Sequence, residues 1–148
     1  MKTICLVLLS VILMSAGWLT DFDKAKETAR TEHKRILLYF SGEDWCYTCK
    51  QTRKQILDQE AFGTYTSNNL VLVNADFPRL NKKSISKDQA KANEELAEIY
   101  NKDMVIPMFV LLDEDGHVIK SWQGNPGVSA QEFVGQLQSA QMVPAAKQ

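Results

Sequence analysis

The stretch from Ile36 to Lys50 has the sequence ILLYFSGEDWCYTCK. Its first five residues form a continuous apolar run, which favours a central strand that is buried on both faces. Its end contains two cysteines, Cys46 and Cys49, in the spacing C-x-x-C. We expect a helix from Cys46 to about Leu57, so the cysteine pair should lie between a buried strand and a helix N-terminus.

A helix N-terminus favours thiol chemistry. Its unpaired backbone N–H groups and its dipole stabilise a thiolate, and the first cysteine of such a pair can have its pKa lowered to roughly 3.5–7.5 from about 8.5. Cys46 is therefore the expected exposed nucleophile. Cys49, one turn further along, is the expected resolving thiol, more buried, which attacks the mixed disulfide and releases the partner. Tyr47 and Thr48 should tune the stability of the thiolate.

The whole chain alternates between helical and extended patterns, in the order α-β-α-β-α-β-β-α. Helices are expected at about 21–33, 46–57, 86–100 and from Ser129, and strands at 36–40, 70–75, 105–112 and 117–120. Asp115-Gly116 is typical of a hairpin turn. Crossovers make the first strands parallel, whereas the hairpin adds an antiparallel edge. The pattern predicts an α/β fold with a small mixed sheet between helices.

Three of these helices have capping signals at their N-termini. The signals are Thr20 with Asp23 in capping-box spacing and Leu19 as an apolar staple, then Ser86 or Asp88, and last Ser129 with Glu132 in a second capping box.

Composition excludes several classes of protein. The chain has 148 residues, 45% of them hydrophobic, and 17 basic against 18 acidic residues. That length favours one domain with a sizeable core. A formal net charge of −1 gives no electrostatic basis for binding nucleic acid. Three cysteines are too few for a disulfide scaffold, and 24% charged residues with four prolines argue against disorder.

The first 17 residues have the three-part layout of a secretory signal peptide. Lys2 precedes an apolar stretch at 4–14, and small residues follow at 15–17. Uncleaved, residues 4–19 would span about 24 Å as a helix, against about 30 Å for a bilayer core. A membrane anchor and a buried helix are the alternatives. We expect a signal peptide at 1–17, a domain at 18–148, and a periplasmic or otherwise extracytoplasmic protein.

With these features together, the sequence resembles the thioredoxin superfamily, and in particular its exported thioredoxin-like proteins. The likeness runs from about Trp18 to Met142 and rests on the core WCYTCK at 45–50, on VNADFP at 73–78 and on VIP at 105–107. It implies a thioredoxin fold with a mixed sheet of four to five strands. It also implies a reductase-type thiol–disulfide oxidoreductase that exchanges disulfides with exported protein substrates through Cys46 and Cys49.

The resemblance also implies a substrate groove. Pro107 is the position of the family's cis-proline, which lies against the cysteine pair, and the backbone of Ile106 would pair with an extended substrate segment. Gly124 is the position of a close-approach glycine in the same groove. Trp45, Tyr47 and Thr48 would complete the groove beside Cys46.

No organic cofactor or metal is implied, because the cysteine pair itself carries two electrons. A redox-recycling partner is implied, and a membrane protein could fill that role.

The alternative function is a thioredoxin-like peptide-binding or chaperone module in which redox activity is secondary. The direction of electron flow is open. A structural zinc site needs about four ligands. After residue 17 the chain offers the cysteine pair and two histidines, His33 and His117, which lie in polar contexts far from the cysteines in sequence. This pattern disfavours a zinc site.

The chain departs from thioredoxin at three places. Tyr39 or Phe40 stands where thioredoxin has a buried aspartate that takes the proton from the resolving thiol, which leaves Glu43, Asp44 or water for that task. Met108 follows the proline, where threonine is usual. The stretch 76–107 is longer than in thioredoxin, and its basic part, 79–87, has the composition of a solvated loop.

Overall fold

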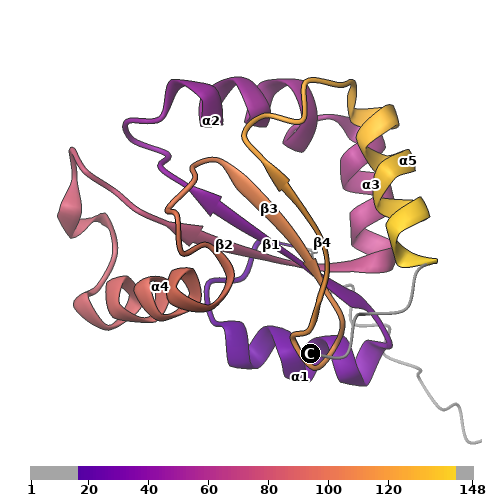
Figure 1. Ribbon diagram of the computed structural model, residues 1–148, viewed down its shortest axis with the longest axis horizontal. Helices are drawn as coiled ribbons and strands as arrows, with labels where there is room; N and C mark the ends of the chain where they lie inside the picture. The colour runs from indigo at the N-terminus through magenta and orange to yellow at the C-terminus, as the bar shows by residue number, and fades with distance from the viewer. Residues whose placement is uncertain (1–16, 143–148) are drawn as a thin grey trace, which may run out of the picture.

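The computed structural model describes residues 17–142. The helices are α1 (Phe22–Glu32), α2 (Tyr47–Thr52), α3 (Glu60–Asn69), α4 (Lys87–Tyr100) and α5 (Ala130–Gln141), and the strands are β1 (Arg35–Ser41), β2 (Leu70–Asp76), β3 (Met108–Leu112) and β4 (Val118–Gln123) (Figure 1). A π-helical segment, Arg53–Leu57, extends α2, and a 3₁₀ turn, Lys82–Ser84, precedes α4.

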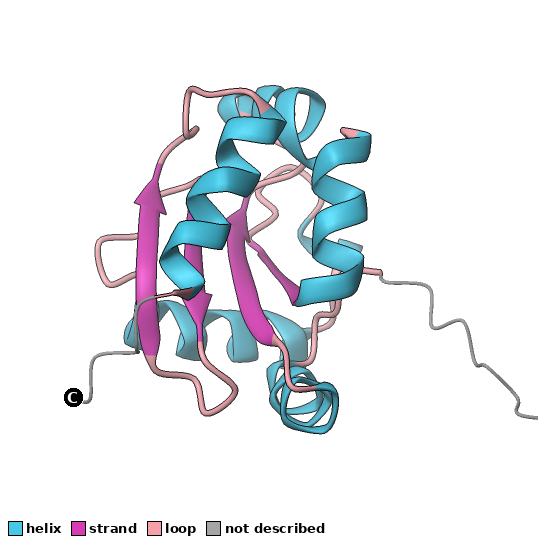
Figure 2. Cartoon of the chain, turned by 90° about the vertical axis from the view of Figure 1, so that its right-hand side faces the viewer, coloured by secondary structure: helices cyan, strands magenta, loops and turns pink. Residues whose placement is uncertain are grey.

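The four strands form one mixed sheet in the order β2-β1-β3-β4. β1 pairs with β2 in parallel, and the pairs β1–β3 and β3–β4 are antiparallel. Helices cover both faces of this sheet (Figure 2). The mixed four-stranded sheet between helices confirms the expected fold class.

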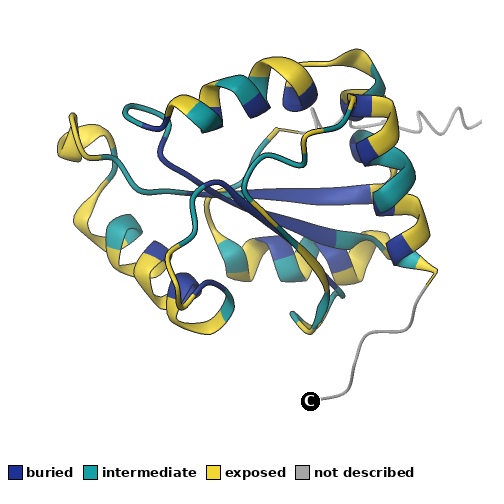
Figure 3. Cartoon of the chain, turned by 45° about the horizontal axis from the view of Figure 1, so that its top comes forward, coloured by how far each residue is buried: buried dark blue, intermediate teal, exposed yellow. Residues whose placement is uncertain are grey.

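The apolar run of β1 has a separate core on each face. Alternate residues such as Leu38 pack with Ala25 and Ala29 of α1, whereas their neighbours such as Leu37 pack with Phe62 of α3 and Phe133 of α5. Figure 3 shows the resulting band of buried strand through the centre, with exposed residues on the outer surfaces of the helices. This burial on both faces is the physical reason for a strand without polar alternation.

Helix α3 was not expected from the sequence, which predicted a single helix from Cys46 to about Leu57. The chain turns after the π-helical segment and begins a second helix at Glu60. The N-cap, Gln59, makes no side-chain capping bond, and only Phe62 and Thr66 of this helix are buried. Two buried positions do not produce a recognisable helical period, so the pattern contains little signal.

Two capping predictions are confirmed and one is wrong. Ser86 caps α4, and Ser129 caps α5 through the expected capping box. Asp21, and not Thr20, caps α1 by accepting the N–H of Lys24. Leu19 packs against the core cluster that contains Ala25 of α1. Its N–H also donates to the Leu72 carbonyl, and its own carbonyl accepts the N–H of Asn74, each at 2.8 Å. It therefore adds a parallel bridge to β2.

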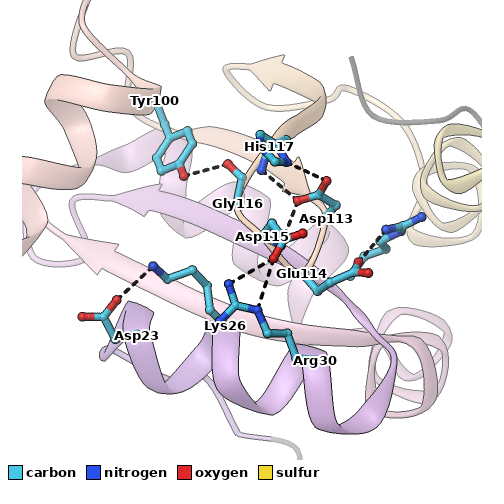
Figure 4. Close-up of polar contacts among 10 residues, drawn as sticks. Asp23, Lys26, Arg30, Tyr100, Asp113, Glu114, Asp115, Gly116 and His117 are labelled. Atoms are coloured by element: carbon cyan, nitrogen blue, oxygen red, sulfur yellow. Dashed lines mark hydrogen bonds and ion pairs between the residues drawn. The ribbon is translucent and has the colours of Figure 1, made fainter. Parts of the chain in front are cut away.

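The predicted hairpin joins β3 to β4 and is attached to two helices (Figure 4). Arg30 of α1 binds the Asp115 carboxylate at 3.0 Å, and the Tyr100 hydroxyl of α4 donates to the Gly116 carbonyl at 2.8 Å. Asp113 accepts the backbone N–H groups of Asp115 and His117 and faces the His117 imidazole at 3.0 Å. These contacts therefore fix the conformation of the turn at 113–117.

The predicted signal peptide at 1–17 lies almost entirely outside the described residues. Trp18 and Leu19, which the possible anchor 4–19 includes, belong to the folded domain, because Trp18 stacks on Phe62 and Leu19 bridges to β2. Over residues 17–142 no helix has the length and apolar character needed to cross a membrane.

Candidate active site

Cys46 and Cys49 form a disulfide at the beginning of α2, with their Cα atoms 5.2 Å apart. Cys46 is the N-cap residue, and its Sγ accepts the N–H of Cys49 at 3.0 Å. A hydrogen bond from a helix N-terminus to this sulfur favours its thiolate in the reduced pair. Cys46 is 5% exposed and Cys49 is fully buried, so the order of exposure agrees with the prediction, although Cys46 is more covered than expected.

Trp45 connects the cysteine motif to the segment after β2. A Cβ atom at Gly42 would overlap the Trp45 indole, so glycine allows the ring to lie against the backbone. The indole N–H donates to the Phe77 carbonyl at 2.7 Å, and the Arg79 guanidinium stacks 3.7 Å from the ring centroid. This contact of Arg79 was not predicted, because the basic composition of 79–87 is that of a solvated loop.

The two acidic residues beside the motif are both engaged. The Glu43 carboxylate binds Arg53 through two hydrogen bonds of 2.7 and 3.1 Å, and this contact raises the pKa of Arg53. The Asp44 carboxylate accepts backbone N–H groups from residues 79–81 at 2.7 to 3.1 Å. The N–H of Asn81, foremost among these donors, lowers the pKa of Asp44. Asp44 thus anchors the loop, and Glu43 is held by a cation.

Tyr39 lies in β1, is fully buried, and belongs to the core cluster that contains Ile56 and Leu57 of the π-helical segment after α2. Its ring stacks on Phe109 with centroids 4.5 Å apart, and its hydroxyl has no hydrogen-bond partner in the described part of the chain. Burial, and then the negative charge of Glu43, raise the pKa of Tyr39. Of the two residues expected at the place of thioredoxin's buried aspartate, Tyr39 is a neutral phenol and Phe40 is a buried apolar ring.

Pro107 follows a cis peptide bond and precedes β3, so this strand begins at Met108 and not at Val105 as predicted. The Gly124 N–H donates to the Pro107 carbonyl at 2.8 Å. Gly124 has a φ of +75°, and no atom lies within 4 Å of a Cβ added there. Glycine is favoured here by the backbone conformation, and the role of Gly124 in the substrate groove stays a prediction.

Tyr47 and Thr48 differ in their surroundings. Tyr47 is 73% exposed and borders a surface hollow with Gly127 and Val128. The Thr48 carbonyl accepts the Thr52 hydroxyl at 2.9 Å, which is a contact inside the helix. The structure brings Trp45 together with the loop at 77–79 and Gly124 together with Pro107. Tyr47 instead borders the separate hollow that Gly127 and Val128 line.

Residues 22–141 match the thioredoxin-like domain family. The chain is 32% identical over 120 residues to the disulfide bond reductase DsbH of Chlamydia pneumoniae. The matched region covers 81% of this chain and 70% of that protein.

Solved structures agree with this match. A structure of a DsbH oxidoreductase superposes with a TM-score of 0.77 at 30% identity, covering 86% of this chain and 85% of that one. The C-terminal domain of Neisseria meningitidis DsbD, at 19% identity and a TM-score of 0.57 over 84% of this chain and 99% of that one, shares the fold. The chain belongs to the thioredoxin-like domain family and is a thiol–disulfide oxidoreductase.

Proposed function

We propose that this oxidoreductase is a disulfide reductase that acts on exported proteins, with Cys46 as nucleophile and Cys49 as resolving thiol. The observation that supports it most directly is the position of the Cys46 sulfur, which caps α2 and accepts the N–H of Cys49. The reductase direction is supported by the name of the Chlamydia pneumoniae relative, a disulfide bond reductase.

The reaction proceeds in two exchanges. The Cys46 thiolate attacks a client disulfide, a new S–S bond forms, and one client sulfur leaves as a thiolate that takes up a proton. The Cys49 thiolate then attacks the Cys46 sulfur, which releases the second client thiol and closes the Cys46–Cys49 disulfide. Two electrons pass from the protein to the client, so a separate dithiol donor must reduce the pair again.

We place this reaction outside the cytosol because residues 1–17 have the layout of a secretory signal peptide. The clients are protein disulfides, and the recycling partner is a dithiol protein that works in the same compartment, with a membrane protein that delivers electrons as one candidate. The groove residues are Trp45, Tyr47, Thr48, Ile106, Pro107 and Gly124.

The experiment is equilibration of a chain beginning at Trp18 with glutathione buffers. A reduction potential near the −270 mV of thioredoxin supports a reductase, whereas a value near −120 mV would make it an oxidant. In parallel, Cys49→Ser should accumulate a mixed disulfide with a reporter protein, and Cys46→Ser should not. Client handling that survives Cys46→Ser unchanged would favour the peptide-binding alternative.

A further inference from the structure

The backbone of Ile106 is free to bind another chain. Within residues 17–142 neither its N–H nor its C=O has a hydrogen-bond partner, although the neighbouring Val105 and Pro107 are both bonded. An extended segment that pairs with such groups gains affinity from the main chain, and its specificity comes from pockets for alternate side chains. A client that pairs with Ile106 therefore needs a pocket close to that residue.

A hollow of about 350 Å³ lies beside Ile106. It is formed where the long connection after β2 folds back toward the turn that precedes the cis-proline. Its apolar lining comes from Phe77, Pro78, Ile85, Met104 and Ile106, with Ala90 of α4 beside them, and charged side chains complete it. The hollow therefore joins residues of two family motifs, Phe77, Pro78 and Ile106, to Ile85 and Met104 of the long connection between them.

Met104 is held in a conformation that its own side chain disfavours. Its φ is +51°, in the left-handed region, where methionine is rarely found. The turn is fixed by the buried Asn101, whose side chain accepts the Val105 N–H at 2.9 Å and donates to the Val105 carbonyl at 2.8 Å. Strain of this kind persists when surrounding bonds over-determine it, and it gathers at binding sites. The result is a methionine that is 47% exposed on the wall of the hollow.

The opposite wall is fixed to the redox motif. Asp44 holds the backbone at 79–81 through three N–H groups, and the Trp45 indole holds the Phe77 carbonyl. The N–H of Phe77 in turn donates to the Ser41 carbonyl at 2.8 Å. One wall is therefore positioned by Asp44 and Trp45, next to the cysteine pair, and the other by Asn101 through the turn that precedes Pro107.

We propose that this hollow, the apolar subsite defined by Phe77, Pro78, Ile85, Met104 and Ile106, takes one apolar side chain of a client segment that pairs with Ile106. The inference rests on the proposed function, because the same segment presents its cysteine to Cys46. It assigns the choice of client to this hollow rather than to the residues between the two cysteines.

The test uses peptides that contain one cysteine joined in a disulfide to 2-nitro-5-thiobenzoate. Each peptide has a single leucine at one position within three residues of the cysteine, on a background of serine and glycine. The pre-reduced protein attacks the disulfide, and release of the chromophore gives the rate. One leucine position should react about tenfold faster than its serine counterpart, equal to about 1.4 kcal/mol, near the lower end for burial of a leucine side chain.

Two variants locate the effect. Met104→Asn combined with Ile85→Ser should bring the leucine-to-serine ratio close to one, and asparagine tolerates the left-handed backbone at position 104. Leu80→Asn is the matched control, because Leu80 is 78% exposed on the same loop and does not line the hollow. It should leave the tenfold ratio intact.

The outcomes are distinguishable. If the wild-type protein shows a normal reduction potential but no leucine position exceeds about twofold, the apolar subsite is refuted while the proposed function stands. A tenfold ratio that survives the double variant, or that Leu80→Asn abolishes equally, also refutes it. If no reversible disulfide forms at any glutathione ratio, the proposed function and the subsite fail together.

Discussion

Removing the hydroxyl of Tyr39 should stabilise the protein. This oxygen is buried without a hydrogen-bond partner in the described residues, and burying a hydroxyl in that way costs about 1–3 kcal/mol in protein mutants. Tyr39→Phe deletes the unpaired group and keeps the ring stacked on Phe109. After allowance for the small space that it leaves, we expect a gain of about 1 kcal/mol in the free energy of unfolding, or about 4 °C in Tm.

Urea and thermal unfolding of the reduced and the oxidised protein measure this gain. Tyr100→Phe is the matched control, because the Tyr100 hydroxyl donates to the Gly116 carbonyl at 2.8 Å. Its removal should lower stability by about 1 kcal/mol, opposite in sign to Tyr39→Phe. A Tyr39→Phe protein that is less stable by 1 kcal/mol or more would refute the reasoning and show that the hydroxyl is satisfied.

The same hydroxyl should make stability depend on pH in the alkaline range. Burial raises the pKa of Tyr39, so the neutral phenol favours the folded state. This contribution is complete below the unfolded pKa of about 10 and is lost as the pH rises above it. Between pH 8 and pH 11 the wild-type protein should lose about 1.4 kcal/mol more than Tyr39→Phe. Parallel losses in the two proteins would contradict the raised pKa.

Three further changes test other contacts. Asn101→Ala removes two hydrogen bonds to Val105 and should lower the free energy of unfolding in urea by about 2 kcal/mol; a loss under about 0.5 kcal/mol would argue against the turn described here. Ser129→Ala removes the cap of α5 and should cost about 1 kcal/mol, visible as a lower Tm. Asp44→Asn should speed amide hydrogen exchange at 79–81. Because the pKa of Asp44 is lowered by the N–H groups it accepts, amide protection at 79–81 in the wild-type protein should decrease as the pH falls through that pKa. Equal exchange in both proteins would show that the carboxylate does not hold the loop.

Sequence reasoning located the fold because its strongest signals are local. The apolar run of β1 records burial on both faces, and the Asp115-Gly116 turn fixes the register of the last two strands. The cysteine motif marks the beginning of α2 in the same way. Each of these signals depends on residues that are neighbours in sequence.

Features that depend on distant partners could not be predicted. Arg79 stacks on Trp45 and thereby joins two loops, neither of which has a periodic pattern. In the basic segment 79–87, nothing in the composition distinguishes Arg79 from the solvated lysines. Asn101 fixes a backbone turn in which Met104 has a positive φ. Methionine rarely adopts that conformation, so residue propensities do not predict the turn. Helix α3 was missed because it buries only two of its residues.

The bridge between Leu19 and β2 has a consequence for association. A sheet in the order β2-β1-β3-β4 has two edges, and an apolar edge strand can recruit a second molecule. Leu19 occupies part of the β2 edge with two main-chain hydrogen bonds, whereas β4 exposes Lys120 and Ser121 on the other edge. A chain trimmed past Leu19 would leave Leu72 and Asn74 with unpaired backbone groups, and it would gain a self-complementary edge for aggregation.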